Sequence, residues 1–265
     1  MTTIQIGIIG GTRGMGRWFA RFFEKAGYIV HISGRNRGMA LDEMTRTCQV
    51  VVVSVPIGVT HTVIKKIGPF MHADSLLMDL TSLKQEPVKA MLETSASEVI
   101  GCHPLFGPHV DIIAGQRVVL CPARTGKWFS WLKDILEKND AVVVETTPEI
   151  HDRMMAIVQG LNHFNTIMMG LALSESGVSF SELCRFATPA FLAKIEIIQK
   201  VFCQNPGLYS EIITMNPDVH QHIEAYEKTV EELKNLICQG NAADIKDMIE
   251  EHATFFKATV PRNSI

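Results

Sequence analysis

The chain has 265 residues, enough for two modest domains, and 46% of them are hydrophobic. A formal net charge of −3, with no Lys/Arg-rich run, gives no indication of nucleic-acid binding. The start shows no signal-peptide pattern, and no window approaches the roughly 18 uninterrupted apolar residues of a membrane span, so we expect a cytoplasmic protein without membrane contact. The six cysteines lack CxxC pairs and metal-ligand spacing, which indicates reduced thiols and no metal.

Short apolar runs alternate with helical patterns up to about residue 145. The runs predict strands at 4–9, 28–32, 50–53, 76–80, 99–103, 117–120 and 141–144. The helical patterns lie at 15–26, 60–67, 85–92 and 125–137. Runs such as VVVV, which do not alternate with polar residues, are typical of a parallel sheet covered on both faces. The fold class predicted is therefore α/β, a Rossmann-like doubly wound parallel sheet.

The pattern changes at Thr146-Thr147-Pro148-Glu149, which reads as a helix start with a Thr cap, an early proline and an acid three residues after Thr146. From there to residue 256 the apolar period is near 3.6, with long helices predicted at 187–204 and 219–239. We therefore predict a dinucleotide-binding domain at 1–147 and an all-α substrate and dimerisation domain at 148–265. An apolar helical bundle of this kind needs a partner surface, which favours a homodimer through the helical domain.

Residues 7–16 read GIIGGTRGMG, directly after the first predicted strand and at the opening of a helix. Glycines there allow a sharp turn and let backbone N–H groups approach a pyrophosphate. Arg13 stands where the middle glycine of GxGxxG is usual, so its side chain points outward, either toward a phosphate or toward solvent. The predicted cofactor-binding residues of this region and of the strand end at 54–56 are Gly10, Gly11, Thr12, Arg13, Gly14, Met15, Gly16, Ser54 and Pro56.

The residues at the end of the second predicted strand indicate whether the dinucleotide is NAD or NADP. An NAD site usually carries an acid there for the ribose hydroxyls, but this chain continues as Ser33-Gly34-Arg35-Asn36-Arg37. An arginine fork suits a 2′-phosphate, which an acid would repel. We therefore favour NADP over NAD, with Arg35 as the main contact, Ser33 in support, and Arg37 either in the site or facing solvent.

Residues 99–108 read VIGCHPLFGP and place His103 at the end of a predicted buried strand. Proline at 104 pushes the residue before it into extended geometry, and strand ends are where open α/β sheets bind ligands. Histidine titrates near neutrality, as a general base must. A histidine at a strand end can equally be structural, so the rest of the chain decides between the two interpretations.

With these motifs the chain resembles the prephenate dehydrogenase family, most closely its short archaeal-type and enteric members. The resemblance rests on six stretches in the same order, namely GGTRGMGRWFA, VVVSVPIGVT, LLMDLTSLK, GCHPLFGP, HDRMMAIVQGLNHF and QNPGLYSEI. It implies oxidative decarboxylation of prephenate to 4-hydroxyphenylpyruvate in tyrosine biosynthesis, with hydride transfer to the nicotinamide. It also implies a monofunctional enzyme, since the first predicted strand begins by Ile4 and the chain ends near Ile265.

The resemblance assigns roles to individual side chains. His103 takes the proton of the ring hydroxyl as hydride leaves its carbon, and Ser82 matches the serine that hydrogen-bonds this histidine, although Ser82 can also be a helix cap. His163 matches a histidine that lines the substrate pocket, and Gln159 shares its helix face at i, i+4. Lys200 stands in the place of an arginine that holds the ring carboxylate, which keeps the charge and loses the two-pronged geometry.

Three alternatives stay open. Arogenate, with an amine in place of the side-chain ketone, fits the same chemistry. A 3-hydroxyacid or imine oxidoreductase shares the order of a dinucleotide domain followed by helices, but would leave HPLFGP without a role. A nucleotide-binding sensor that has lost catalysis is consistent with the departures at Arg13 and Lys200, although it gives no reason to keep His103, Ser82 and His163 together.

Overall fold

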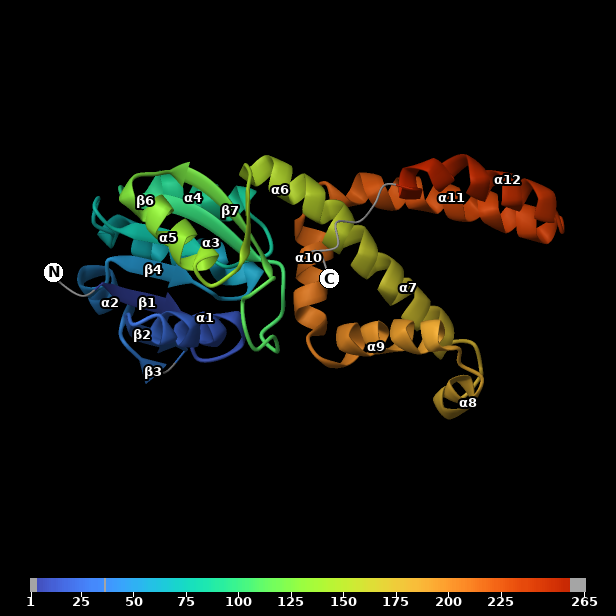
Figure 1. Ribbon diagram of the computed structural model, residues 1–265, viewed down its shortest axis with the longest axis horizontal. Helices are drawn as coiled ribbons and strands as arrows, with labels where there is room; N and C mark the ends of the chain where they lie inside the picture. Colours follow the sequence, from blue (N-terminus) through green and yellow to red (C-terminus); the bar gives the residue numbers. More distant parts are fainter. Residues whose placement is uncertain (1–3, 36, 258–265) are drawn as a thin grey trace.

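A single mixed β-sheet forms the centre of the N-terminal half of the chain, and the C-terminal half is helical throughout the described residues (Figure 1). The computed structural model describes residues 4–35 and 37–257. The strands are β1 (Gln5–Ile9), β2 (Ile29–Gly34), β3 (Arg37–Gly38), β4 (Val50–Val53), β5 (Leu76–Asp79), β6 (Glu98–Pro104), β7 (Arg117–Arg124) and β8 (Val142–Glu145). The helices among them are α1 (Gly14–Lys25), α2 (Leu41–Thr47), α3 (Ile57–Ile67), the 3₁₀ turn η1 (Gly68–Phe70), α4 (Gln85–Thr94) and α5 (Lys127–Glu137).

The strand order is β3-β2-β1-β4-β5-β6-β7-β8. Because β1 pairs in parallel with both β2 and β4, the chain winds away from β1 in both directions, which confirms the doubly wound fold class. Two pairs are antiparallel, β2 with β3 and β6 with β7. The second is a departure from the predicted parallel sheet, and its cause is local. Residues 105–116 contain no helix, and a parallel return normally needs a helical crossover.

Helices cover both faces of the sheet. Aromatic residues of α1 and α5 pack on one face with Val50 and Val52, whereas α2, α3 and α4 pack on the other face with Val51 and Val53. All four valines are fully buried. A strand enclosed on both faces has no solvent side, so its sequence shows no polar alternation. The short elements β3 and α2 were not predicted, because neither has a long apolar run.

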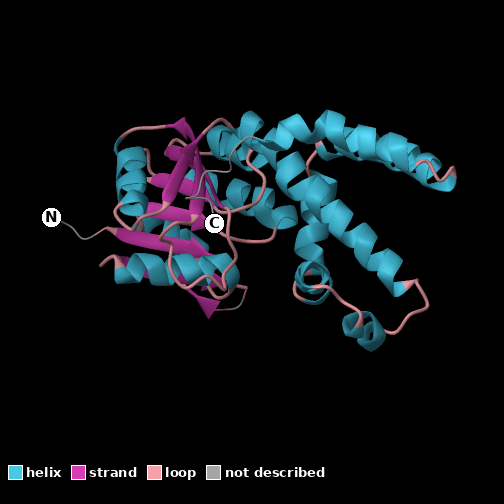
Figure 2. Cartoon of the chain, turned by 45° about the vertical axis from the view of Figure 1, so that its right-hand side comes forward, coloured by secondary structure: helices cyan, strands magenta, loops and turns pink. Residues whose placement is uncertain are grey.

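The C-terminal half consists of helices, as Figure 2 shows. They are α6 (Pro148–Met155), the π-helix η2 (Ala156–Leu161), α7 (Asn162–Ser174), α8 (Phe180–Arg185), α9 (Pro189–Cys203), α10 (Pro206–Met215), α11 (Val219–Cys238), α12 (Ala242–His252) and the 3₁₀ turn η3 (Ala253–Lys257). The two long helices predicted at 187–204 and 219–239 correspond to α9 and α11. The cap of α6 is Thr147 rather than Thr146, since its side chain accepts from the N–H of Ile150.

Two carboxylates of the helical half dock it on the sheet half. Asp152 of α6 accepts the backbone N–H groups of Lys84 and Gln85, where α4 begins, at 2.8 and 2.9 Å. Glu211 of α10 accepts the N–H of Ile57, the first residue of α3, at 3.1 Å. Each carboxylate satisfies N–H donors that a helix N-terminus leaves free. The two halves are therefore held at the carboxyl edge of the sheet, where β5 leads into α4 and β4 leads into α3.

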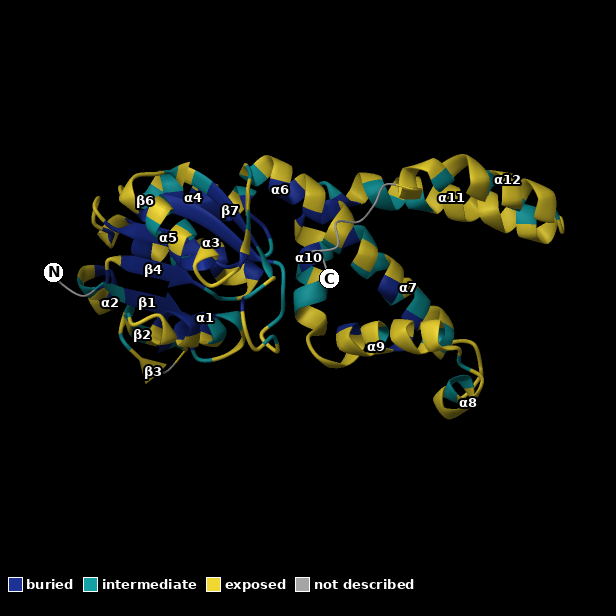
Figure 3. Ribbon diagram, in the orientation of Figure 1, coloured by how far each residue is buried: buried dark blue, intermediate teal, exposed yellow. Residues whose placement is uncertain are grey.

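Burial differs sharply between the halves (Figure 3). The central strands β1, β4, β5 and β6 are almost wholly buried, and the outer strands β2, β3 and β8 are partly exposed. The helical half exposes large apolar side chains such as Phe186 at 79% and Val158 at 55%. Within the described ranges, no helix combines the length and the apolar character that crossing a membrane requires.

Candidate functional site

The turn between β1 and α1 has the geometry of a dinucleotide cradle. Gly10 has φ +85°, and a Cβ on it would lie 1.9 Å from the backbone oxygen of Ser54. A Cβ on Gly16 would lie 2.6 Å from the oxygen of Gly10. Only glycine fits at either position, because the turn folds onto the end of β4 and onto the helix that it opens.

The same turn leaves room for an anion at its helix. The N-cap of α1 is Arg13, whose side chain makes no capping hydrogen bond, so no side chain satisfies the first N–H groups of α1. Such N–H groups, together with the helix dipole, are what a pyrophosphate binds. The predicted residues Gly10 to Gly16 form this turn, and Ser54 and Pro56 adjoin it at the end of β4, where Ser54 donates its N–H to Ile9 at 2.8 Å. The residues present therefore fit a dinucleotide.

The end of β2 lies against this turn. The carbonyl of Ser33 accepts from the N–H of Gly10 at 2.8 Å, and a Cβ on Gly34 would meet the side chain of Thr12 at 2.6 Å. Arg35 follows directly and is exposed, as is Arg13 on the neighbouring turn. Residues 29–40 contain no acid, and the next acid, Asp42, is paired with Arg46 at 2.8 Å.

His103 occupies the second-last position of β6, as predicted, and its residue exposure is 4%. Its strand lies between β5 and β7, and its register partner on β7 is Val119. The carboxyl end of β6 shares the sheet edge with the ends of β1, β4 and β5, which run parallel to it. The buried histidine therefore lies on the edge of the sheet that carries the dinucleotide turn.

A second histidine, from the helical half, completes the surroundings of His103. Nδ1 of His103 lies 2.8 Å from Nε2 of His151 on α6. Nδ1 of His151 in turn lies 2.6 Å from Oδ1 of Asp152. His151 and Asp152 are 2% and 3% exposed. The three side chains form one buried hydrogen-bonded chain that crosses from the sheet to the helices.

A buried ion pair lies behind this chain. Lys84 and Asp79 are both fully buried, and Nζ of Lys84 donates to Oδ2 of Asp79 and, at 2.9 Å, to the carbonyl of Cys102. Thr81 donates its backbone N–H to the same carboxylate oxygen at 2.9 Å. The pair ties the end of β5 to the residue immediately before His103.

Gln159 reaches His103 from the opposite side. Its Nε2 lies 3.5 Å from Nε2 of His103, and its Oε1 is buried without a partner among the described residues. Gln159 belongs to η2, a π-helix between α6 and α7. Such wide turns occur mostly at functional sites, because they redirect a side chain that a regular α-helix would point elsewhere.

The other predicted site residues surround this centre less closely. His163 of α7 packs edge-to-face against Tyr209 of α10, with ring centroids 4.8 Å apart. Lys200 is exposed in the last turn of α9, and its side chain makes no hydrogen bond or ion pair with any described residue. The expected hydrogen bond from Ser82 to His103 is not formed in the described part of the chain. The N-cap of α4 is Lys84, so Ser82 does not cap that helix either.

Burial sets the protonation of the histidines. It lowers the pKa of His103 well below the ordinary value, and the neighbouring His151 and the charge on Lys84 lower it further. Burial also lowers the pKa of His151, against a smaller opposing effect of its hydrogen bond to Asp152. The pKa of His163 is lowered by burial as well. His103 and His151 are therefore neutral at pH 7.

The partners of His103 were not predicted from the sequence. The stretch HDRMMAIVQGLNHF contains His151 and Asp152, but no local pattern pairs them with His103 or pairs Lys84 with Asp79. One signal was available, because Asp79 directly follows the buried run LLM and a buried carboxylate needs a partner. The pairing of His103 with His151 depends on tertiary structure alone.

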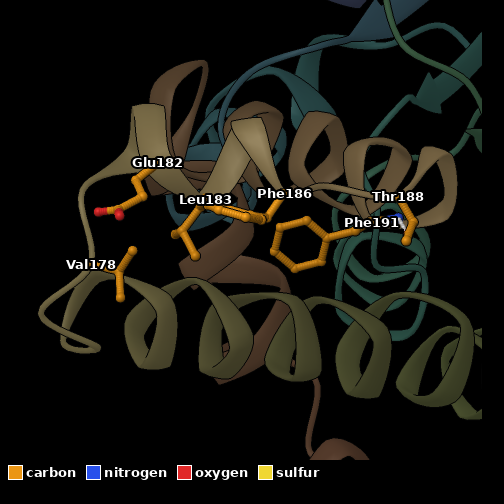
Figure 4. Close-up of a pocket in the computed structure, with 6 residues that line it drawn as sticks. All are labelled: Val178, Glu182, Leu183, Phe186, Thr188 and Phe191. Atoms are coloured by element: carbon orange, nitrogen blue, oxygen red, sulfur yellow. Dashed lines mark hydrogen bonds between the residues drawn. The ribbon is translucent and has the colours of Figure 1, made fainter.

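A cavity of about 500 Å³ lies elsewhere, at the end of the helical half away from the sheet (Figure 4). Its lining is mostly apolar and is formed by Val178, Glu182, Leu183, Phe186, Thr188 and Phe191. It contains none of the groups around His103. No group of three or more His, Cys, Asp or Glu residues in the described chain is arranged to hold a metal ion.

Comparisons with known proteins agree with this architecture. The sequence model described as "Prephenate dehydrogenase, nucleotide-binding domain" matches residues 23–145, and "Prephenate dehydrogenase, dimerization domain" matches residues 147–251. The "Probable arogenate/prephenate dehydrogenase" of Methanocaldococcus jannaschii is 35% identical over 99% of this chain and 63% of its own length. The "T-protein" of Haemophilus influenzae is 33% identical over 86% of this chain and 60% of its own length. The chain thus spans less than two thirds of either relative.

A solved structure has the same fold. The prephenate dehydrogenase from A. aeolicus, crystallised with hydroxyphenyl propionate and NAD+, superposes with a TM-score of 0.77 at 20% sequence identity. The match covers 97% of this chain and 98% of that one.

Proposed function

Because the chain belongs to the prephenate dehydrogenase family, we propose that it converts prephenate to 4-hydroxyphenylpyruvate and CO₂ in tyrosine biosynthesis, with hydride transfer to NADP. One observation carries the proposal. A buried, neutral histidine, His103, stands at the sheet edge that also carries an anion-binding dinucleotide turn. The dinucleotide domain is proposed to comprise residues 1–147 and the substrate and dimerisation domain residues 148–265.

His103 is the base of the proposed reaction. An alcohol releases hydride readily when its O–H proton is removed at the same time, and a neutral imidazole accepts that proton at pH 7. The bound nicotinamide supplies the hydride acceptor. His103 holds the proton at a ring nitrogen while the ring carboxylate departs as CO₂, and aromatisation of the ring makes the reaction irreversible.

Side chains from both halves are proposed to hold the substrate. Gln159 lies against the base and carries an unpartnered buried oxygen, so it is placed to contact the reacting hydroxyl. His163 is one helical turn further on and contributes to the pocket wall with its pKa lowered by burial. Ser82 and Lys200 complete the proposed site, Ser82 beside the base and Lys200 toward a substrate carboxylate. Both would form their contacts only with substrate present.

The preference for NADP rests on the end of β2. Arg35 is exposed at the end of β2, Arg13 is exposed on the turn, and Ser33 near the end of β2 accepts from the N–H of Gly10 in that turn. Two guanidinium groups and no nearby free acid suit a 2′-phosphate better than a bare ribose. NAD is the alternative cofactor, and it is distinguished from NADP by comparing turnover with each.

We further propose a homodimer formed through the helical half. The exposed apolar residues of this half, which include Val158 and Phe186, are the surface that such an interface buries. Light scattering should then give twice the chain mass of 29.5 kDa, and a monomer at micromolar concentration would contradict the proposal.

The proposed activity is tested by giving purified protein prephenate or arogenate with NADP or NAD and following reduced nicotinamide by absorbance. Prephenate with NADP should give the highest kcat/KM, with one CO₂ released per hydride transferred. Faster turnover of arogenate would reassign the substrate and keep the chemistry. No turnover with any of the pairings would refute the proposed function.

A further inference from the structure

On the premise of the proposed function, in which His103 is the base, we propose that His151 and Asp152 are positioning residues. Together they hold the proton of His103 on Nδ1, so that the lone pair of Nε2 faces the substrate hydroxyl. Both residues belong to the helical half, whereas His103 belongs to the sheet. The base is therefore completed across the boundary between the two halves.

Asp152 is the fixed end of the hydrogen-bonded series His103–His151–Asp152. Its Oδ1 accepts the N–H of Lys84 at 2.8 Å and its Oδ2 accepts that of Gln85 at 2.9 Å. Its own carbonyl accepts from the amide of Asn216 at 2.8 Å. With both oxygens serving as acceptors for the first N–H groups of α4, the carboxylate cannot rotate away from His151.

The direction of each hydrogen bond follows from the Asp152 carboxylate, which can only accept. Asp152 acts as an acceptor, so His151 donates its Nδ1–H to it over 2.6 Å. A neutral imidazole carries one N–H, which leaves a lone pair on Nε2 of His151. That lone pair can accept only a proton of His103, so the 2.8 Å contact is Nδ1–H of His103 donating to Nε2 of His151. Nε2 of His103 is then the free base.

The position of Gln159 is consistent with the same assignment. Its amide nitrogen, a donor, lies 3.5 Å from Nε2 of His103, which suits a lone pair there. With the opposite tautomer of His103, an N–H would face this N–H₂ group and the two donors would repel. The unpartnered Oε1 of Gln159 is also consistent with a site that receives a hydroxyl.

The charges around His103, His151 and Asp152 preserve the direction of the hydrogen bonds that join them. If His151 were protonated, its Nε2–H would point at His103 and force the proton of His103 onto Nε2, which would disable the base. Burial of His151 and the positive charge of Lys84 oppose that protonation, whereas Asp79 and Asp152 favour it. Burial has the largest effect and lowers the pKa of His151, so His151 stays neutral and the hydrogen bonds keep this direction at pH 7.

The tautomer is measured without substrate by ¹⁵N NMR of histidine-labelled wild-type protein, with the His103 signals assigned by their loss in His103→Asn. The expected result is a protonated Nδ1 and an unprotonated Nε2. A protonated Nε2 in the wild type overturns the inference, whether or not the protein turns over prephenate. Absence of turnover with the expected tautomer would instead refute the proposed function alone.

Variants separate positioning from mere packing. His151→Phe removes the acceptor, so protonated Nε2 should appear in His103, and kcat should fall by about 10²–10⁴ with little change in KM. In His151→Gln the side-chain oxygen can accept from Nδ1 of His103. Relative to His151→Phe, this variant should therefore recover much of kcat and return the proton of His103 to Nδ1. An unchanged His103 tautomer in His151→Phe, or equal loss of kcat in both variants, overturns the inference. His220→Asn, on the exposed face of α11, is the matched histidine control and should change neither measurement.

Discussion

Nδ1 of His103 lies 2.8 Å from Nε2 of His151, although the two residues are 48 positions apart and belong to different halves of the molecule. The contact lies where Asp152 of the helical half accepts the first N–H groups of α4. The carboxylate that orients His151 is the same one that caps α4. Asp152 therefore contributes both to the docking of the halves, together with Glu211, and to the orientation of the base.

The acid limb of the pH–rate profile should lie below the ordinary histidine pKa. A base works in its unprotonated form, and burial, with His151 and Lys84, lowers the pKa of His103 well below 6.5. As pH falls from 8 to 6.5, kcat/KM should therefore stay nearly level, and it should decline only at lower pH, where His103 takes up a proton. A decline centred at or above pH 6.5 would contradict this protonation state.

Stability should also decrease in acid because of the same residue. The unfolded chain binds a proton at His103 near pH 6.5, whereas the folded chain does so only at lower pH. The contribution is complete above pH 6.5 and is lost as pH falls toward the folded pKa. His103→Asn should reduce the pH dependence of the free energy of unfolding in this window, as measured by urea titration at several pH values. An identical pH dependence in both proteins would show that His103 is not the group concerned.

Arg35→Ala should weaken NADP binding by about 10- to 100-fold, and should change NAD binding by less than about threefold, because only NADP carries the phosphate that the guanidinium contacts. Isothermal titration with both dinucleotides measures the two constants. Arg21→Ala, at an exposed arginine of α1, is the control and should change neither constant. Equal weakening of NAD and NADP by Arg35→Ala would count against a phosphate contact.

Lys84→Met should cost about 3–5 kcal/mol of unfolding free energy, because it leaves Asp79 buried without its partner. The exposed pair of Lys133 with Glu145, at 2.7 Å, provides the comparison, and Lys133→Met should cost far less than Lys84→Met because water screens that pair. Urea unfolding measures both. Replacing Asp79 by Leu in the Lys84→Met background should restore part of the loss, and a larger loss in the double variant would contradict the assigned pairing.

Lys200→Ala should raise KM about tenfold and change kcat much less, since a charge that holds a substrate carboxylate contributes to binding before and during reaction alike. Lys200→Arg should lower KM, because the planar fork binds a carboxylate at two points. Lys194→Ala, exposed on the same helix, is the control. If Lys194→Ala and Lys200→Ala gave the same KM, the carboxylate role of Lys200 would be wrong.

The central strands β4 and β5 could be predicted closely because they are buried on both faces. Val50–Val53 has no polar residue and its bounds were predicted to the residue, whereas the short hairpin strand Arg37–Gly38 carries no apolar run and was missed. The antiparallel pairing of β7 was missed for another reason. The direction of a strand depends on the path of the connecting loop, and residues 105–116 show no periodicity that reveals that path.

The position of His103 followed from local sequence, but its chemistry did not. A proline after an apolar run places it at a strand end. Its contacts with His151 and Gln159 depend on how α6 and η2 lie across the sheet edge, which involves pairs 48 and 56 residues apart. The π-helix at Ala156–Leu161 was likewise missed, because its apolar pattern is compatible with an ordinary helix.

The central claim, that His103 is the base of a nicotinamide-dependent oxidation, is tested most directly by comparing His103→Asn with the wild type under saturating prephenate and NADP. The account predicts that kcat falls by about 10²–10⁴ while the dissociation constant for NADP and the unfolding midpoint at pH 8 stay close to those of the wild type. A kcat within about threefold of the wild type, with NADP bound normally, would contradict it.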